Sequence, residues 1–174
     1  MGLLNAAVWL GSTVFFVLVA APTLLSSSMK NLLGPNNFPF FAGAVLQLLT
    51  RNFYTLQIIC GAVALLHMIG EWLYLGRPLR RFNTALLSSL FVLALVCKLL
   101  VSPKTERLHR LKHAPNRPAE VTNAAAKSLQ VWQGLGHGLN FIILAGVTLH
   151  FWRIVNAGGT SATARFVPAV KLGI

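Results

Sequence analysis

Three polar side chains near the ends of two apolar stretches could hold a metal ion or a cofactor. His67 and Glu71 are four residues apart, so they lie on one face of a helix. His150 lies near the end of a later apolar stretch, on the same membrane side if the chain crosses four times. Imidazole and carboxylate groups bind copper, and one His can also ligate haem or the magnesium of a chlorophyll-type pigment. The competing interpretation is a Glu71 at the membrane surface, hydrogen-bonded to His67 or paired with Arg77 or Arg80.

A second polar group lies in the segment QGLGHGLNF. His137 and Asn140 are three residues apart and share a helix face, and Gly134 and Gly138 form a small-xxx-small pair. Such glycine pairs let two helices approach closely, and His and Asn side chains then hydrogen-bond across the contact. The pattern favours a polar packing seam, although His137 could also be an axial ligand or relay protons.

Motifs that carry common enzyme chemistry are missing from the sequence. The chain has no G-x-S-x-G, no H-E-x-x-H, no phosphate-binding loop and no Asp at any position. Cys60 and Cys97 are far apart and form no C-x-x-C pair. We therefore expect a protein that is not an enzyme.

The composition indicates an integral membrane protein. Of 174 residues, 55% are hydrophobic and 10% are charged, against about 25% charged in a soluble domain. Lys and Arg number 15 and Asp and Glu number 3, which gives a net charge of +12. The apolar content excludes a disordered tail, and we expect no nucleic-acid partner, because aromatic residues are not interleaved with the basic ones.

Four stretches without charged residues predict an all-α fold, a single-domain four-helix membrane bundle. They cover residues 2–29, 52–70, 82–97 and 128–152, and a membrane-spanning helix needs about 20 apolar residues. Lys98 can extend the third span because its side chain can reach the interface. No Lys or Arg precedes the first stretch, so we expect a retained helix and no cleavable signal peptide. The predicted spans are 4–26, 53–75, 84–101 and 131–155.

Three further segments lie outside these spans. Residues 38–50 are uncharged but too short to cross, so we predict an additional interfacial amphipathic helix between spans one and two. Residues 102–127 are predicted to be a basic loop, of which the last part continues span four outward as a helical stalk. Residues 157–174 form the C-terminal tail.

The basic loop carries a dense run of positive charge. This run could form a surface for anionic lipid headgroups or an acidic partner, or it could be a solvated anchor that sets topology. The two sides of the membrane carry similar numbers of basic residues, so the orientation stays open. The residues in question are Lys104, Arg107, Arg110, Lys112 and Arg117.

The order of these segments resembles a known family. The residues that carry the resemblance are AAVWLGSTVFFVLVAAPTLL, AGAVLQLLTRNFYTLQ, LLVSPKTERLH and VWQGLGHGLNF, within residues 6–155. They are similar to four-helix membrane proteins typified by transmembrane protein 205, whose shared domain is of unknown function. The resemblance implies four spans and a helical bundle but no activity. In that family a small hydroxyl residue often follows three after the His, where this chain has Asn140. A looser likeness to copper-resistance membrane proteins keeps a metal or haem function open.

These observations favour a non-catalytic subunit or scaffold of a larger membrane assembly, respiratory or photosynthetic, in the bacterial inner membrane. Its partners would be other membrane-protein subunits, lipids with anionic headgroups, or pigments. One alternative is a small haem- or copper-handling protein that uses His67, His137 or His150. A second alternative is a small-solute transporter.

Overall fold

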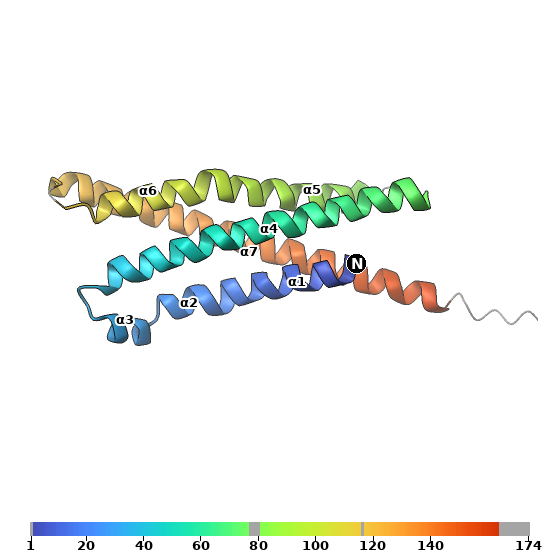
Figure 1. Ribbon diagram of the computed structural model, residues 1–174, viewed down its shortest axis with the longest axis horizontal. Coiled ribbons are helices and arrows are strands. Elements are labelled where there is room, and N and C mark those ends of the chain that lie inside the picture. The colour runs from blue at the N-terminus through green and yellow to red at the C-terminus, as the bar shows by residue number, and fades with distance from the viewer. Residues whose placement is uncertain (1, 77–80, 116, 164–174) are drawn as a thin grey trace, which may run out of the picture.

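The structure, a computed structural model, describes residues 2–76, 81–115 and 117–163, and this part of the chain is helical with no strand (Figure 1). Four of its helical rods are long and apolar enough to cross a membrane, which confirms the predicted fold class. The elements are α1 (Gly2–Val14), η1 (Phe15–Ala20), α2 (Ala21–Leu24), α3 (Ser27–Leu33), α4 (Phe38–Leu75), α5 (Arg81–Val96), η2 (Cys97–Val101), α6 (Ser102–Lys112) and α7 (Ala119–Thr163).

Local signals fix where these helices begin and end. The Ser26 hydroxyl accepts a hydrogen bond from the Met29 amide at 3.3 Å and caps the start of α3. α3 ends at Gly34, which has a φ of 75°. α4 begins with a proline in its first turn and ends at Gly76, which adopts the left-handed conformation that glycine tolerates best.

Two of the rods pass through a proline. Pro22 follows the π-helical turn η1, and Pro103 follows the π-helical turn η2. Each π turn closes with an amide that reaches back five residues, Ala21 to Phe16 and Ser102 to Cys97. The wider turn moves carbonyl groups away from the proline ring, which would otherwise clash with the preceding turn. The helices therefore continue, and the third rod runs on past residue 101, where we predicted the third span to end.

The segments outside the predicted spans are also more helical than expected. No separate interfacial helix is found over 38–50, because α4 runs without interruption from Phe38 to Leu75. The prediction of a basic loop over residues 102–127 also needs correction. Most of this segment is helical, because α6 and the first turns of α7 occupy it. No proline lies between positions 40 and 75, so α4 can continue through the level of Lys98, and it does so although it contains Gly43, Gly61 and Gly70. The C-terminal tail from residue 164 lies outside the described residues.

α4 is too long to lie inside a bilayer. Its 38 residues span about 57 Å at 1.5 Å per residue, against a hydrocarbon thickness of about 30 Å. We take the level of Lys98 as one membrane surface, because a charged side chain is expected at the edge of the hydrocarbon. Its Nζ donates to the Arg51 carbonyl at 2.9 Å and to the Thr55 hydroxyl at 2.6 Å. Beyond this level lie residues 27–50 and 102–130, which we call the head. Figure 1 shows α3, α6 and the first parts of α4 and α7 together at one end of the bundle.

A buried polar network joins the first rod to α4 inside the bundle. The Trp9 indole N–H donates a hydrogen bond to the side-chain oxygen Oε1 of Gln57. The side-chain Nε2 of Gln57 donates to the Thr13 hydroxyl at 2.8 Å. Thr13 in turn donates to the Trp9 carbonyl at 2.7 Å. All three side chains have no exposed surface. Polar groups in hydrocarbon need partners within the protein, and this network supplies them.

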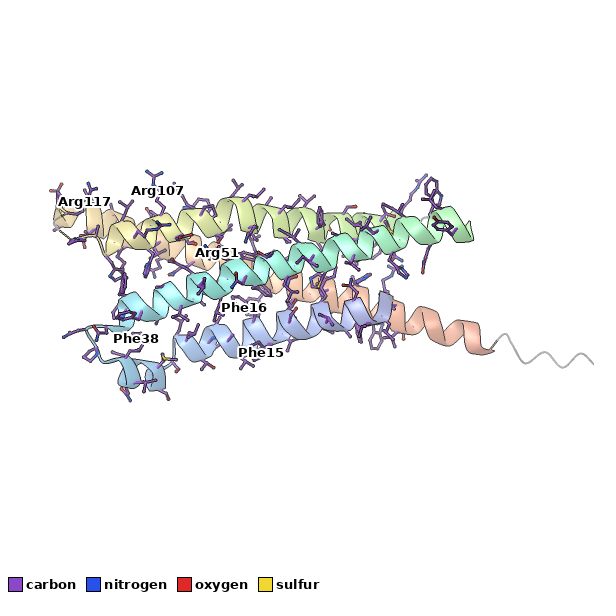
Figure 2. All side chains as sticks on the ribbon, in the orientation of Figure 1. Phe15, Phe16, Phe38, Arg51, Arg107 and Arg117 are labelled. Carbon is purple, nitrogen blue, oxygen red and sulfur yellow. The ribbon has the colours of Figure 1, made fainter. Side chains whose placement is uncertain are left out.

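Aromatic and aliphatic side chains fill the rest of the core. Phe16 stacks on Phe53 with ring centroids 4.1 Å apart. Figure 2 shows Phe16 pointing toward α4 and Phe15 pointing away from the bundle, in agreement with their burial. The core also includes Leu46, Tyr54, Cys60, Leu87, Leu90, Cys97, Ile143 and Val147.

We expect Gln57→Leu to lower the free energy of unfolding by about 1–3 kcal/mol, because it leaves the buried Trp9 N–H without an acceptor. Thermal unfolding in detergent would measure this loss. The matched control is Gln130→Leu, which removes an exposed amide from α7 and should leave the midpoint unchanged. Equal midpoints for Gln57→Leu and the wild type would contradict the stabilising role of the network.

Candidate functional site

Uncharged polar side chains from three rods surround a small cavity near the Lys98 membrane surface. Its volume is about 50 Å³, which holds a few water-sized groups. α4, α6 and α7 all contribute to its wall, which also includes Gly136 and Val101. The polar members are Gln47, Thr50, Tyr54, Ser102, Thr105, Gln133, His137 and Asn140.

Tyr54 and Asn140 meet at this cavity. The Tyr54 hydroxyl interacts with the side chains of Cys97 and Asn140, so Tyr54 connects α4 with η2 and α7. Tyr54 and Cys97 are almost fully buried, and Asn140 is 5% exposed. The Asn140 carbonyl oxygen Oδ1 is buried and has no hydrogen-bond partner within the described part of the chain. The site therefore offers a hydrogen-bond acceptor that this part of the chain does not satisfy.

A second cavity adjoins the first one and has mostly apolar walls. Its volume is about 180 Å³, and it lies between the first rod and α7. Val17 and Leu25 line it from one side and Phe141 from the other. The two cavities share Phe16, Ala21, His137 and Asn140.

Both π-helical turns lie next to these cavities. η1 supplies Phe16, and η2 ends at Val101 in the wall of the smaller cavity. π turns frequently occur at functional sites, because they interrupt the helix register and change where side chains point. In this protein each π turn also accommodates the proline that follows it. The two prolines are therefore associated both with the path of the rods and with the walls of the cavities.

The predicted cluster of His67, Glu71 and His150 lines a single cavity at the opposite end of the bundle. This cavity has a volume of about 430 Å³ and also contacts Gly2 and Asn83. The imidazole Nδ1 of His67 lies 3.6 Å from Glu71 Oε1, and both side chains are about 40% exposed. His150 is buried and contacts the Trp9 ring edge to face, with centroids 6.2 Å apart.

A metal centre is not assembled at this cavity. Among the described residues, no group of three His, Cys, Asp or Glu side chains is placed to hold a metal ion. His67 and Glu71 lie close to each other, as the competing interpretation from the sequence also requires. The other two proposed partners of Glu71, Arg77 and Arg80, lie outside the described residues.

The predicted packing seam is only partly present. Asn140 makes the expected contact between helices, with Tyr54 of α4. His137 is exposed, and a Cβ at Gly134 or Gly138 would meet no described atom within 4 Å, so these glycines do not pack within the chain. Their place in the sequence pattern suggested a seam, but α7 is rotated so that they face outward.

Two other glycines make the close contacts of α7. A Cβ at Gly136 would lie 3.5 Å from Val101, and one at Gly146 would lie 2.6 Å from Leu90. Sequence analysis missed both of them. The signal was available, because Gly136 precedes Asn140 by four residues and so lies on the same helix face.

The basic residues of the head lie on α6 and at the turn before α7. Lys104, Arg107 and Arg110 are exposed, and Arg110 pairs with Glu106 one turn earlier. Lys112 is half-buried and Arg117 is exposed. Figure 2 shows Arg107 pointing outward from α6. The positive surface predicted from the sequence is thus carried by a helix.

Two His residues in the head were not singled out by sequence analysis. His109 stacks on Phe40 with centroids 5.7 Å apart, and His113 contacts the same ring at 5.5 Å. The two imidazoles are 4.7 Å apart, and the Nε2 atom of each is buried without a hydrogen-bond partner in the described part of the chain. Their i, i+4 spacing in α6 was the available signal.

Comparison with known proteins identifies the family. Residues 4–114 match the model of a family described as Domain of unknown function (DUF4149). The chain belongs to the DUF4149 family. No curated protein and no solved structure matches it. The DUF4149 match includes the first three rods, whereas α7, with His137, Asn140 and His150, follows the matched residues.

The head of this DUF4149 protein should lose stability in acid. Burial lowers the pKa of His113 below its ordinary value, and the nearby His109 and Lys112 lower it further. The folded head therefore favours the neutral imidazole. Its contribution to stability is complete above the unfolded pKa of about 6.5 and declines as the pH falls toward the folded pKa.

We expect the thermal midpoint in detergent to fall between pH 8 and pH 5, and His113→Gln to reduce this fall. Hydrogen exchange in α6 would report whether the head is the part that opens. An unchanged pH dependence in His113→Gln would contradict the role of this residue.

Proposed function

We propose that this protein is a non-catalytic integral membrane subunit that binds a second membrane protein through its head, in the bacterial inner membrane. The observation that carries this proposal is a band of exposed apolar side chains on the head part of α4. We define the apolar band as Phe40, Phe41, Val45, Leu48 and Leu49.

The apolar band lies on the N-terminal side of Arg51, beyond the membrane surface marked by Lys98. Its side chains are between 38% and 50% exposed, and in the described structure they form the outer face of α4. Within hydrocarbon such exposure is favourable, because lipid covers it. Beyond the hydrocarbon, exposed apolar patches mark contacts with other proteins or with the membrane surface.

The length of α4 supports a protein partner over lipid. The uncharged part of α4, residues 52–70, is about 28 Å long and already matches the hydrocarbon thickness. A continuous helix cannot also lay its first turns flat on the membrane. In this arrangement the apolar band would lie away from the lipid tails, where a neighbouring subunit could cover it.

The basic face of α6 adds a second element of recognition. Lys104 and Arg107 are exposed on the same head and have no carboxylate partner among the described residues. Such charges steer association with acidic surfaces and contribute at anionic headgroups. A partner with an acidic rim around an apolar patch would match both features of the head.

The chemistry of the chain favours a structural role. The sequence has no Asp and only three acidic residues, and Glu106 is paired with Arg110. Catalysis by paired carboxylates therefore has no residues to use. Membership in a family of unknown function leaves the identity of the assembly, respiratory or photosynthetic, to experiment.

We expect Phe41→Gln combined with Val45→Gln to release a stoichiometric partner that co-purifies with the wild type in mild detergent. Native mass spectrometry would measure the released and retained complexes. The control is Val121→Gln, an exposed apolar residue of the head on α7 that lies outside the apolar band. Recovery of the wild type as a single chain without a partner would overturn the proposal.

A second candidate function is the binding of haem, copper or a chlorophyll-type pigment at the cavity of about 430 Å³. The observation that favours it is that His67 and His150 reach the same cavity from two different rods. One of them could act as an axial ligand. The looser likeness of the sequence to copper-resistance membrane proteins would agree with this alternative.

Under this second function, the purified protein should show a Soret band or a pigment absorption band. His150→Leu should remove the band, whereas the same change at His113, in the head, should preserve it. A wild-type spectrum without visible absorption, together with no copper by elemental analysis, would exclude this function.

A further inference from the structure

We propose that the two adjoining cavities around Asn140 bind an uncharged amphiphile that carries a hydroxyl group. The hydroxyl would donate a hydrogen bond to Asn140 Oδ1 in the smaller cavity. The apolar part would lie in the larger cavity between the first rod and α7. This site is independent of the proposed subunit role, because it lies inside the bundle and not on the apolar band.

The unpartnered oxygen of Asn140 carries the argument. The residue is 5% exposed, and its Oδ1 atom accepts no hydrogen bond from the described part of the chain. A buried acceptor without a donor is costly, and more so beside hydrocarbon than in a wet interior. The neighbouring Tyr54 hydroxyl interacts with Cys97 and Asn140 but does not donate to this oxygen in the described structure. The missing donor therefore comes from a bound molecule.

The wall chemistry selects an uncharged ligand. No Lys, Arg, Asp or Glu lines either cavity among the described residues. Hydroxyl and amide groups surround the smaller cavity, and Gln133 and Ser102 have no side-chain hydrogen bond of their own in the described structure. A charged headgroup would enter without a counter-charge, which is strongly unfavourable in a low-dielectric site.

The shapes of the two cavities indicate an amphiphile. The smaller one, about 50 Å³, holds only a few heavy atoms, as a hydroxyl-bearing end group does. The larger one, about 180 Å³, is lined by Phe16, Val17, Leu25 and Phe141 and suits an apolar chain or ring. Phe141 is 56% exposed on α7, so the larger cavity borders the surface that faces lipid.

The depth of the site agrees with this ligand. Gln47 and Thr50 of the cavity wall precede Arg51, whose carbonyl binds Lys98 at the membrane surface. The polar end of the site thus lies at the level of the headgroups. A lipid alcohol or a quinol places its hydroxyl at this depth.

The test uses the purified full-length chain in phosphatidylcholine nanodiscs. The probe is hexadecanol with a photoreactive diazirine in its chain, and cross-linked residues are mapped by mass spectrometry. We expect labelling within 16–25 and 133–141. Asn140→Leu, which keeps the side-chain volume but removes the acceptor, should weaken probe binding by about tenfold.

Asn5→Leu is the matched control. Asn5 is also a partly buried amide, but it donates to the Cys60 carbonyl, away from both cavities. This variant should label like the wild type. Equal labelling of Asn140→Leu and the wild type would overturn the proposal.

A second measurement does not depend on any variant folding. Hexadecanol should raise the thermal midpoint of the wild type, and 1-methoxyhexadecane, which lacks the donor, should not. Equal effects of the two compounds, or no effect of either, would mean that water alone fills the cavity or that the hydroxyl is not recognised, and would overturn the proposal.

Competition then distinguishes the two natural sources of the hydroxyl. Displacement of the probe by dioleoylglycerol would assign the site to a lipid alcohol, and displacement by reduced decylubiquinone would assign it to a quinol. Either result supports the proposal. Failure of both to compete would contradict it.

Discussion

The cost of an unpaired polar group in hydrocarbon governs this structure. Trp9, Gln57 and Thr13 are fully buried, and each polar atom that they bring into the bundle finds a partner within the first rod or α4. Asn140 is buried to a similar degree but leaves its Oδ1 without a donor. The network of Trp9, Gln57 and Thr13 therefore stabilises the fold, whereas the partner of Asn140 Oδ1 lies outside the described part of the chain. Natural proteins tolerate such an exception mainly where something binds.

A second constraint is the mismatch between helix length and bilayer thickness. α4, the third rod and α7 are all longer than hydrocarbon requires, and their extra turns gather at one end as the head. There the apolar band of α4 and the basic face of α6 lie on one small structure. The head is packed through the Phe40, His109 and His113 rings, so its surface is presented on a rigid base. This makes it suitable for docking, whereas the opposite end offers a partly exposed cavity.

The glycines and prolines expected to end helices show where the sequence predicted helix ends correctly and where it did not. Gly34 and Gly76 end helices, as glycine with positive φ should. Pro22 and Pro103 do not, because a π turn before each one accommodates the ring. The predicted interfacial helix and basic loop failed for a related reason: each was inferred from charge and length, although the local residues permit helix throughout.

The sequence by itself determined the medium and the number of crossings. Uncharged stretches of sufficient length can be counted directly, since hydrocarbon excludes charge and unpaired backbone alike. The sequence also predicted that His67, Glu71 and His150 lie at the same end of the bundle. Each helical residue advances by a fixed rise, so the position of a residue within a span gives its depth in the membrane. Only the tertiary structure decided the rotation of each rod about its axis. That rotation turns Gly134 and Gly138 outward and Gly136 and Asn140 inward. It depends on how side chains of different rods interlock, which no single segment encodes.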